Sequence, residues 1–451
     1  MGIPMTQPDH ITPLSNKGVK PSTGRQNRRS FLKSTLAVAS LPQIVLPSTL
    51  GRGATPPSER ITIGFIGAGK MARGYHMGTL LKFDDVQALA VCEVDLTRRD
   101  SGREKVNAAY AGRGVKKGCD TYNHYRDVLA REDIDAVVIA TPDHWHAIPV
   151  IEACQAGKDV YCEKPLTLTL EESRLCIEAV RKHRRVFQTG SQQRSSVFGP
   201  FRQACEIIRS GRIGKVKKVS VGVGEPSIPC DLPAEDFEPG LDWDLWLGAA
   251  PARPYHSALS PRGVHNHFPQ WRRYREYSGG GHTDMGAHHY DIAHWALDLD
   301  GTGPVEIMPP SDPKAMRGVR YRYENGIEIV HGGPGGCFFE GTEGSLRIDR
   351  GHLSASKDEI VKEPIGENDI HLYRSPGHHR DWLNCIRSRQ DPVAPVEAGA
   401  RTVSVIHLGN LAYWNRRKLS WNPKKWEFVN DSEANRWRDR ERRDPWQLPS
   451  V

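Results

Sequence analysis

The chain of 451 residues is long enough for two domains behind an N-terminal leader, and its overall net charge is +8. Most of that charge lies in residues 1–58, which carry seven Lys and Arg against one Asp, so the rest of the chain carries only +2. A body so close to neutral has no broad basic surface, and we predict no nucleic-acid partner.

The leader has the pattern of an export signal. Residues 27–33 read N-R-R-S-F-L-K, and a mostly apolar stretch follows over 34–45. Paired arginines before such a stretch are typical of the twin-arginine signal; a Sec signal is the alternative. The stretch is too short for a membrane span, and Pro42 interrupts it. We therefore predict a leader and linker over 1–58, a periplasmic protein and no integral membrane segment.

Short apolar runs alternate with helical patterns from residue 61 to about 190. Strands are expected at 61–66, 86–92, 136–140, 160–162 and 186–189, and helices at 70–82, 146–156 and 170–183. Such alternation is typical of a parallel sheet with crossover helices. We predict one α/β domain over 59–190.

After residue 190 the pattern changes to spaced strand-like runs. They lie at 216–223, 319–323, 327–331 and 345–348, and two helices are expected at 378–389 and 397–416. We predict a second domain over 191–420 and a Trp- and Arg-rich tail over 421–451, in which charges of both signs alternate as on a solvated face. The nine cysteines form no C-x-x-C pair and mostly lie in apolar runs, so we expect no disulfide framework.

The first strand runs into G-A-G-K-M-A, a nucleotide-binding fingerprint of the form G-x-G-x-x-A. Gly67 allows a tight turn, Gly69 lets the backbone approach a pyrophosphate, and Ala72 permits close packing of helix and strand. The helix opened by Lys70 and Met71 presents unpaired N–H groups to the phosphates. The fingerprint predicts that the N-terminal domain is a dinucleotide-binding Rossmann domain.

Glu93 follows the second strand, 24 residues after Gly69. A carboxylate there accepts hydrogen bonds from the adenosine ribose hydroxyls, which favours NAD over NADP. Arg98 and Arg99 lie nearby, and an arginine can hold a 2′-phosphate, so NADP stays open. Because no free dinucleotide pool exists outside the cytoplasm, we expect an exported protein to keep its cofactor tightly bound.

Three further motifs carry a resemblance to a known family. T-P-D-H-W-H occupies 141–146, G-K-D-V-Y-C-E-K-P occupies 157–165, and G-G-G-H-T-D-M-G-A-H-H-Y-D occupies 279–291. From about 61 to 423 the chain resembles the glucose–fructose oxidoreductase, inositol dehydrogenase and rhizopine-catabolism (Gfo/Idh/MocA) family, whose hallmark is the E-K-P tripeptide, often with a cis proline bond. The resemblance implies a C-terminal α/β domain with a large, open, mostly antiparallel sheet, and a homodimer or homotetramer.

Oxidation of a carbinol needs a base near the hydroxyl and a donor that stabilises the developing alkoxide. Asp284, His288 and Asp291 are spaced i, i+4 and i+7, on one face of a helix after the glycine run. By resemblance, His288 is the general acid/base, Lys164 polarises the reacting hydroxyl, and Asp284 orients substrate and base. Asp291 is expected to be structural.

Other candidates follow the strand ends, where ligands bind in such sheets. Those expected at the cofactor are Thr141, Pro142, His146, Glu163 and Lys164. Arg194, after the sixth strand, is expected to bind substrate, as Asp284 and His288 are. His146 could instead open the next helix, and His265 and His267 either line the sugar pocket or lie on a surface loop. The histidines within 282–294 permit a metal site, but the resembled family generally needs none, and we predict none.

Together the motifs indicate an exported NAD(P)-dependent oxidoreductase that transfers hydride between a bound nicotinamide and a hydroxyl of a sugar, glycoside or polyol. One alternative is an NAD-dependent glycosidase, which oxidises a ring hydroxyl transiently, eliminates the aglycone and returns the hydride. The retained Lys164 favours the redox function. A second alternative is a non-catalytic sugar-binding protein on a Rossmann scaffold, against which the intact fingerprint, Glu93, Lys164 and His288 count.

Overall fold

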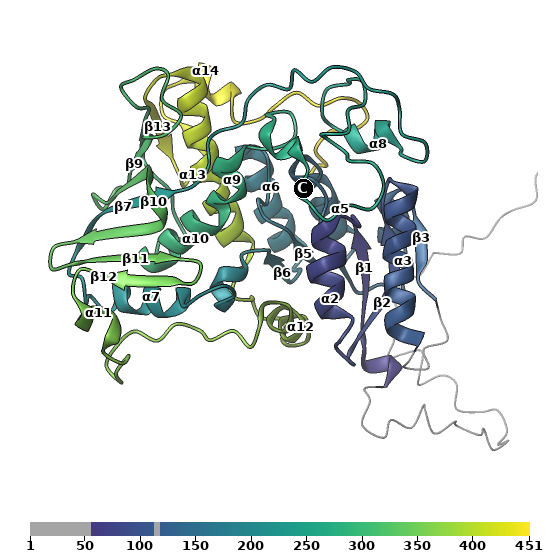
Figure 1. Cartoon of the computed structure of the whole chain (residues 1–451), viewed down its shortest axis with the longest axis horizontal. Helices are drawn as coiled ribbons and strands as arrows, with labels where there is room; N and C mark the ends of the chain where they lie inside the picture. Colours follow the sequence, from purple (N-terminus) through teal and green to yellow (C-terminus); the bar gives the residue numbers. More distant parts are fainter. Residues whose placement is uncertain (1–55, 112–117) are drawn as a thin grey trace, which may run out of the picture. The chain divides into compact units, whose positions relative to one another are not determined.

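The computed structural model describes residues 56–111 and 118–451 (Figure 1). The predicted twin-arginine signal and nearly all of its linker lie outside the described residues. In the part that is described, no helix is both long enough and apolar enough to cross a membrane.

The first domain is built on a six-stranded parallel sheet in the order β3-β2-β1-β4-β5-β6. Its strands are β1 (Ile61–Ile66), β2 (Val86–Cys92), β3 (Asp120–Tyr122), β4 (Ala136–Ile139), β5 (Asp159–Cys162) and β6 (Phe187–Thr189). The chain order reverses between β1 and β4, which opens a crevice at the carboxyl ends of the strands. The sequence-based prediction of a Rossmann sheet is confirmed.

Helices connect these strands. They are η2 (Ala72–His76), α2 (Met77–Leu80), α3 (Leu96–Ala111), α4 (Tyr125–Leu129), η3 (Asp143–Trp145), α5 (Ala147–Gln155) and α6 (Leu170–Lys182). The single regular helix expected over 70–82 instead contains the π-helical turn η2. Helix α3 escaped prediction because its sequence is polar almost all round, with few buried side chains.

The second domain is built on an eight-stranded, mostly antiparallel sheet in the order β12-β11-β10-β9-β8-β13-β14, with β7 paired to β10. Its strands are β7 (Val216–Gly222), β8 (Glu306–Met308), β9 (Arg320–Arg322), β10 (Glu328–Gly341), β11 (Ser345–Asp349), β12 (His352–Ala355), β13 (Leu419–Asn422) and β14 (Glu427–Phe428). Strand β10 continues through the glycine-rich run 332–336, where its register against β7 shifts. The expected strand over 327–331 was therefore too short, because glycines usually indicate a turn.

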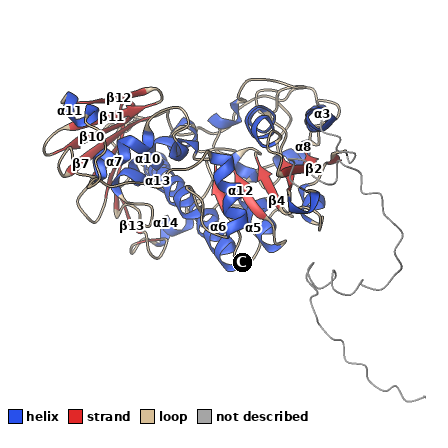
Figure 2. Ribbon diagram, turned by 90° about the horizontal axis from the view of Figure 1, so that it is seen from below, coloured by secondary structure: helices blue, strands red, loops and turns tan. Residues whose placement is uncertain are grey.

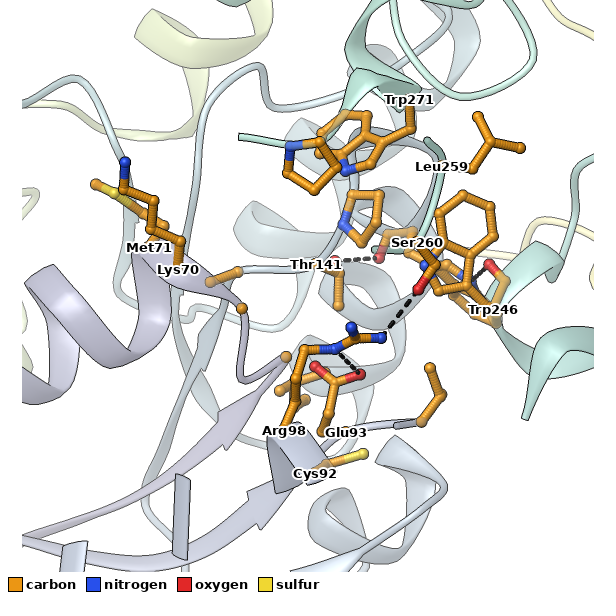
Figure 3. Close-up of a pocket in the computed structure, with 18 of the residues that line it drawn as sticks. Lys70, Met71, Cys92, Glu93, Arg98, Thr141, Trp246, Leu259, Ser260 and Trp271 are labelled. Atoms are coloured by element: carbon orange, nitrogen blue, oxygen red, sulfur yellow. Dashed lines mark hydrogen bonds and ion pairs between the residues drawn. The ribbon is translucent and has the colours of Figure 1, made fainter. Parts of the chain in front are cut away.

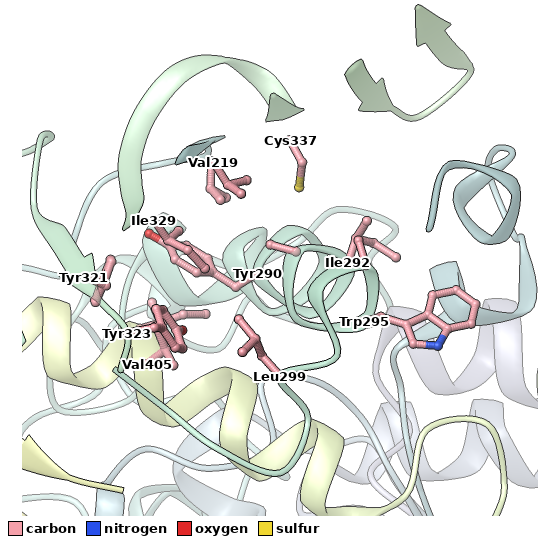
Figure 4. Packing of buried hydrophobic residues seen from close by; sticks show 14 of the residues in the cluster. Val219, Tyr290, Ile292, Trp295, Leu299, Tyr321, Tyr323, Ile329, Cys337 and Val405 are labelled. Atoms are coloured by element: carbon pink, nitrogen blue, oxygen red, sulfur yellow. The ribbon is translucent and has the colours of Figure 1, made fainter. Parts of the chain in front are cut away.

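Helices α7 (Phe201–Arg209), α10 (Gly286–Leu297) and α13 (Val396–Asn415) lie against one face of this sheet (Figure 2). Tyr290 and Ile292 of α10 belong there to one buried apolar cluster with Val219 and Ile329 of the sheet (Figure 4). The remaining helices are η1 (Pro57–Glu59), η4 (Gln192–Ser195), α8 (Trp243–Leu247), η5 (Gln270–Arg273), α9 (Gly281–Asp284), α11 (Asp358–Lys362), α12 (His378–Ser388) and α14 (Ser432–Arg436). Because nearly all residues of α10 are buried, packing fixes the position of residues 286–291, which end the glycine motif.

The Trp- and Arg-rich tail packs on the body of the protein. The ring centroid of Trp446 lies 4.8 Å from that of Trp145, within the apolar cluster of the first domain. The side chain of Arg442 is only 3% exposed and pairs with Glu172 at 2.8 Å. The prediction of a solvated face was therefore wrong at Arg442, because a periodic charge pattern cannot reveal a carboxylate supplied by a distant helix.

All nine cysteines are free thiols, and all but Cys230 are buried. Burial raises the pKa of thiols such as Cys162 and Cys176 well above the usual value, which keeps them protonated and unreactive.

Candidate active site

The fingerprint forms a tight turn at the carboxyl end of β1. Gly67 has a φ of +91°, and a Cβ there would lie 2.8 Å from the carbonyl oxygen of Ala140 at the end of β4, so only glycine fits. A Cβ on Gly69 would meet nothing within 4 Å. The backbone therefore borders open space, as it must if a pyrophosphate is to approach it.

Glu93 lies beside this turn. Its Oε2 accepts a hydrogen bond from Ala68 N at 2.8 Å, and its Oε1 accepts one from Asp95 N at 3.2 Å. These donors hold the carboxylate at the rim of the crevice, where the ribose of a dinucleotide would meet it. The site therefore fits an adenosine ribose with free hydroxyls.

Both nearby arginines have partners within the protein, and Arg98 Nε also lies 4.0 Å from Glu93 Oε1. Arg98 is buried and donates to the carbonyl oxygen of Pro261 at 2.7 Å and to Ser260 Oγ at 2.9 Å (Figure 3). Arg99 donates to Asn123 Oδ1 at 3.1 Å. Arg98 therefore borders the cavity beside Glu93, and it is the carboxylate of Glu93 that favours NAD over NADP.

A cavity of about 930 Å³ extends from the turn beneath a segment of the second domain. Its lining includes the predicted Gly67, Gly69, Lys70, Met71, Glu93, Thr141 and Pro142, together with Trp145, Trp246, Leu259, Trp271 and Arg272 (Figure 3). Its position beside the fingerprint and its mostly apolar walls suit a dinucleotide. Ala72 is fully buried and does not line the cavity, so its role is the close packing that its small side chain allows.

A second cavity of about 880 Å³ adjoins the first and shares Met71, Thr141 and Trp271 with it. It brings the E-K-P motif and the glycine motif together. Its lining is Met71, Ala140, Thr141, Asp143, Glu163, Lys164, Gln192, Phe198, Phe268, Trp271, Arg272, Asp284, Met285, His288 and Arg350. The three residues predicted to be catalytic therefore surround one space next to the dinucleotide cavity.

Lys164 and Asp284 form an ion pair across the two domains. Lys164 Nζ lies 2.7 Å from Asp284 Oδ1 and 2.8 Å from its carbonyl oxygen, and Arg272 Nε is 3.7 Å from the same carboxylate. Burial raises the pKa of Asp284, but Lys164 and Arg272 outweigh burial and hold that pKa below its usual value. Lys164 is followed by a cis bond to Pro165. The pair fixes an ammonium donor at the cavity wall.

His288 is buried at the same wall. Burial lowers its pKa well below the usual value of a histidine, and the charges of Lys164 and Arg350 act in the same direction. Its Nδ1 has no hydrogen-bond partner among the described residues. A neutral imidazole that lines the same cavity as an ammonium group can take a proton from a hydroxyl that the ammonium polarises.

Glu163 is buried behind Lys164 and belongs to a polar network. It accepts from Gln192 Nε2 at 2.8 Å, and its Oε1 lies 3.1 Å from Nε2 of His76, which is the last residue of η2. Burial raises the pKa of Glu163, but the contact with His76 and the charge of Lys164 hold it below its usual value. His76 Nδ1 is in turn 2.8 Å from His379 Nε2. These contacts hold the E-K-P loop in place from the side of η2.

The structure gives Arg194 a role other than substrate binding. It is buried outside the cavity, with its Nε 2.9 Å from Asp291 Oδ1 and its Nη1 2.7 Å from Asp300 Oδ2. Two carboxylates occupy its guanidinium, so substrate contact is contradicted. Asp291 pairs as expected, but it does not share a helix face with Asp284, because the helix breaks at Met285 between α9 and α10.

His146 also lies away from both cavities. Its Nδ1 is 2.8 Å from the carbonyl oxygen of Pro165 and its Nε2 is 3.0 Å from that of Thr141. It ties together the loops after β4 and β5, and the prediction that it touches the cofactor is not met. His265 lines the dinucleotide cavity rather than a sugar pocket, whereas His267 is exposed.

Several cavity residues were missed by the sequence interpretation. Asp143 is buried and accepts from Ser278 Oγ at 2.6 Å, and burial raises its pKa to about 6. Arg350, on the turn between β11 and β12, lies over the ring of Phe198 at 4.5 Å. Asp143 could have been noted as the only carboxylate in T-P-D-H-W-H, but no local signal identifies Phe198 or Arg350.

The other histidines within 282–294 have separate partners. His282 Nδ1 lies 2.7 Å from Asn410 Oδ1, His289 Nε2 lies 3.6 Å from Asp349, and His294 Nε2 lies 2.7 Å from Tyr323 Oη. Among the described residues no cluster of three or more His, Cys, Asp or Glu side chains is arranged to hold a metal ion.

Solved structures with this fold are numerous. Levoglucosan dehydrogenase in complex with NADH and levoglucosan matches with a TM-score of 0.53 and 18% identity, over 80% of this chain and 99% of that one. The WlbA dehydrogenase from Bordetella pertussis, in complex with NADH and UDP-GlcNAcA, matches with a TM-score of 0.53 and 18% identity, over 81% and 98%. At this identity the similarity concerns the fold alone.

Curated relatives match over part of their length. An uncharacterized oxidoreductase YrbE of Bacillus subtilis is 29% identical over 173 residues, and a glycosyl hydrolase family 109 protein of Shewanella pealeana is 32% identical over 165 residues. The aligned part covers 38% and 32% of this chain, but only 47% and 35% of those relatives. The chain thus spans less than half of the length of either relative.

Two family models match consecutive parts of the chain. The NAD-binding Rossmann fold of an oxidoreductase family matches residues 61–191, and the C-terminal alpha/beta domain of the same family matches residues 227–448. The first match contains the fingerprint and the E-K-P motif, and the second contains the glycine motif. These motifs meet at the adjoining cavities. The chain therefore belongs to the Gfo/Idh/MocA oxidoreductase family.

Proposed function

We propose that the protein oxidises a hydroxyl of a sugar, glycoside or polyol to a carbonyl, or reduces such a carbonyl, with a resident NAD. The observation that carries the proposal is the single space in which Lys164, Asp284 and His288 meet, next to the cavity lined by the fingerprint and Glu93. When bound, the nicotinamide accepts or returns the hydride.

The chain's own residues supply proton transfer and charge stabilisation. Lys164 donates a hydrogen bond to the reacting oxygen and stabilises its developing negative charge, and Asp284 keeps the ammonium in place. Neutral His288 takes the hydroxyl proton as the hydride leaves the carbon, and the carbinol becomes a carbonyl. The exposed rings of Phe198 and Phe268 offer apolar faces for the sugar.

Export and assembly are parts of the same proposal. The N-R-R-S-F-L-K motif supports twin-arginine export, and export of a folded protein with its cofactor would explain a dinucleotide cavity covered by a second domain. Replacing both arginines (Arg28→Lys with Arg29→Lys) should trap the protein in the cytoplasm, as cell fractionation would show; undiminished export would contradict the assignment.

Light scattering on the purified protein would test the expected dimer or tetramer.

A second candidate is glycoside cleavage by transient oxidation. The family 109 relatives support it, and so does Asp143, whose pKa of about 6 suits a carboxylic acid that protonates a leaving oxygen. In that cycle the hydride returns to the same molecule after the aglycone has left, so no free dinucleotide is consumed.

One experiment separates the two. Purified mature protein is incubated with a panel of glycosides and free sugars without added NAD, and the products are analysed for keto-sugar and for released aglycone. Keto-sugar together with reduced bound NAD supports the oxidoreductase, whereas catalytic aglycone release supports the glycosidase. A protein that carries no dinucleotide, binds none and changes none of the sugars would contradict both.

A further inference from the structure

A segment of the second domain, residues 240–272, lies over the dinucleotide cavity and is called the cover segment here. It supplies much of the wall opposite the fingerprint. The cover residues that line the cavity are Leu245, Trp246, Leu259, Ser260, Pro261, His265, Phe268, Pro269, Trp271 and Arg272. Any dinucleotide in the cavity is therefore enclosed between the Rossmann sheet and this segment.

The first part of the cover segment is fixed by backbone pairing and apolar packing. Leu96 N donates to the carbonyl oxygen of Gly240, and Asp242 N donates to that of Val94, both at 2.9 Å. Further along, the carbonyl oxygen of Trp246 accepts from the indole of Trp145 at 2.9 Å. The segment also has a small apolar core of its own, in which Trp243 and Trp246 stack at 4.6 Å.

The second part, over 260–268, is held differently. Between 261 and 268 no side chain is fully buried, and Val264 and Phe268 are about half exposed. Apolar burial therefore contributes little to keeping this loop in place. Among the described residues, its hydrogen bonds to the first domain come from two arginines, Arg98 and Arg73.

Arg98 makes most of these contacts. Its Nη1 donates to the carbonyl oxygens of Pro261 at 2.7 Å and Gly263 at 3.3 Å, and its Nη2 donates to Ser260 Oγ at 2.9 Å. On the other side, its Nη2 lies 3.3 Å from Asp95 Oδ2. Charge-assisted bonds of a buried, oriented guanidinium are among the stronger hydrogen bonds in proteins.

Arg73 makes a second contact from the helix that follows the fingerprint. It is buried in η2, and its Nη2 donates to the carbonyl oxygen of His265 at 3.0 Å. The loop is thus tied on two sides of the cavity, at the end of β2 by Arg98 and beside the phosphate turn by Arg73.

We propose that Arg98, assisted by Arg73, is a latch that holds the loop 260–268 closed over the dinucleotide and makes it a cofactor that does not exchange. The inference rests on the proposed function, because it concerns retention of the same dinucleotide. In the closed state the cofactor cannot leave without breaking the Arg98 contacts, so the dissociation rate depends on the latch.

The test is cofactor exchange, not catalysis. The full-length protein, loaded with NAD, is mixed with an excess of isotopically labelled NAD, and the bound dinucleotide is extracted at intervals and analysed by mass spectrometry. Arg98→Met should shorten the exchange half-time by about tenfold or more, since three hydrogen bonds of the closed state are lost. Arg73→Met and Ser260→Ala should each shorten it less.

Arg103→Met is the matched control. Arg103 lies on the same helix α3 but is exposed and pairs with Asp100 at 3.2 Å, away from the cover segment. Its exchange half-time should equal that of the wild type. Thermal unfolding of the cofactor-free variants checks that the fold is intact, and Ser260→Ala and Arg73→Met carry the test if Arg98→Met does not fold.

Four outcomes would overturn the latch. A folded Arg98→Met protein that exchanges NAD as slowly as Arg103→Met would do so, as would wild-type-like exchange in both milder variants when Arg98→Met does not fold. Rapid exchange by the wild type would also overturn the latch and leave the proposed function standing. A wild-type protein that neither carries nor binds NAD would overturn the proposed function and the latch together.

Discussion

His288 combines burial with neighbouring positive charge. Both lower its pKa, so the imidazole stays neutral near pH 7 and is able to accept a proton. Asp284 and Lys164 neutralise each other at 2.7 Å, so neither needs a protonation change to stay in place. In the proposed reaction, the site therefore offers one uncharged base and one fixed cation.

His288→Ala should slow reduction of the bound NAD by about 10²–10⁴-fold, the usual contribution of general acid–base assistance. Dinucleotide content should stay unchanged, because His288 does not line the fingerprint cavity. Single-turnover absorbance after substrate addition measures the rate, with the exposed His267→Ala as the control. A His288→Ala protein that reduces its NAD at nearly the wild-type rate would remove this histidine from the mechanism.

Glu93→Gln should weaken NAD binding by about 1–3 kcal/mol, because charge-assisted bonds to a ribose become neutral ones and the bond to Ala68 N weakens as well. Calorimetry on the cofactor-free protein gives the affinity, and the exposed Glu104→Gln on the neighbouring helix is the matched control. Equal affinities of the two variants would show that Glu93 does not contact the ribose.

At the scale of elements, two short segments position the site. The turn after β1 needs a positive φ at Gly67. The π-helical turn η2 is wider than a regular helix, and its last residue, His76, contacts Glu163. Widened π turns are frequent at functional sites. Both segments are local departures from regular structure that bring backbone or side chain to the crevice.

Gly67→Ala should disable dinucleotide binding. The new Cβ would lie 2.8 Å from the carbonyl oxygen of Ala140, at a φ that alanine rarely adopts, so the β1 turn must move away from β4. Dinucleotide content after purification should fall below a tenth of the wild-type value. This corresponds to a loss of about 1.4 kcal/mol or more in binding free energy. Gly157→Ala, a positive-φ glycine with open space around it, serves as the control; full dinucleotide content in Gly67→Ala would contradict this account of the turn.

At the scale of the whole molecule, many histidines are buried in both domains. Burial lowers the pKa of His294, His331, His378 and His407 to about 4, and it lowers those of His282 and His379 further below the usual value. Below about pH 6.5 these histidines therefore bind protons in the unfolded chain but stay neutral in the folded protein. Each tenfold difference in proton affinity corresponds to about 1.4 kcal/mol.

The free energy of unfolding should accordingly fall as the pH drops from 6.5 to 4. These histidines contribute their full stability above pH 6.5 and lose it toward pH 4. Asp143 and Asp291, whose pKa burial raises to about 6, act in the opposite direction, but they are fewer. Urea titrations at pH 7.5, 6, 5 and 4 would measure the trend; a constant or rising stability would contradict it.

Much of the fold was predictable because its signals are local. Alternating apolar runs located the parallel strands, and the fingerprint placed Gly67 and Glu93 at strand ends that a parallel sheet gathers at one edge. Prediction failed where local and tertiary preferences disagree. Strand β10 continues through a glycine-rich run because it pairs with β7 on both sides of the bend, and no periodicity shows such pairing.

The sequence by itself determined the dinucleotide turn, since the turn depends on residue types at short spacings whose backbone geometry is intrinsic. It pointed to Lys164, Asp284 and His288 only through the family resemblance, and the structure brings these three to one cavity. Only the tertiary structure decided which partners the charged side chains take. Arg194 binds Asp291 and Asp300, and Arg98 binds the cover segment while it also borders the cavity beside Glu93. Those partners lie about 100 to 160 residues away along the chain, and the pairing of groups so distant is set by packing of the two domains.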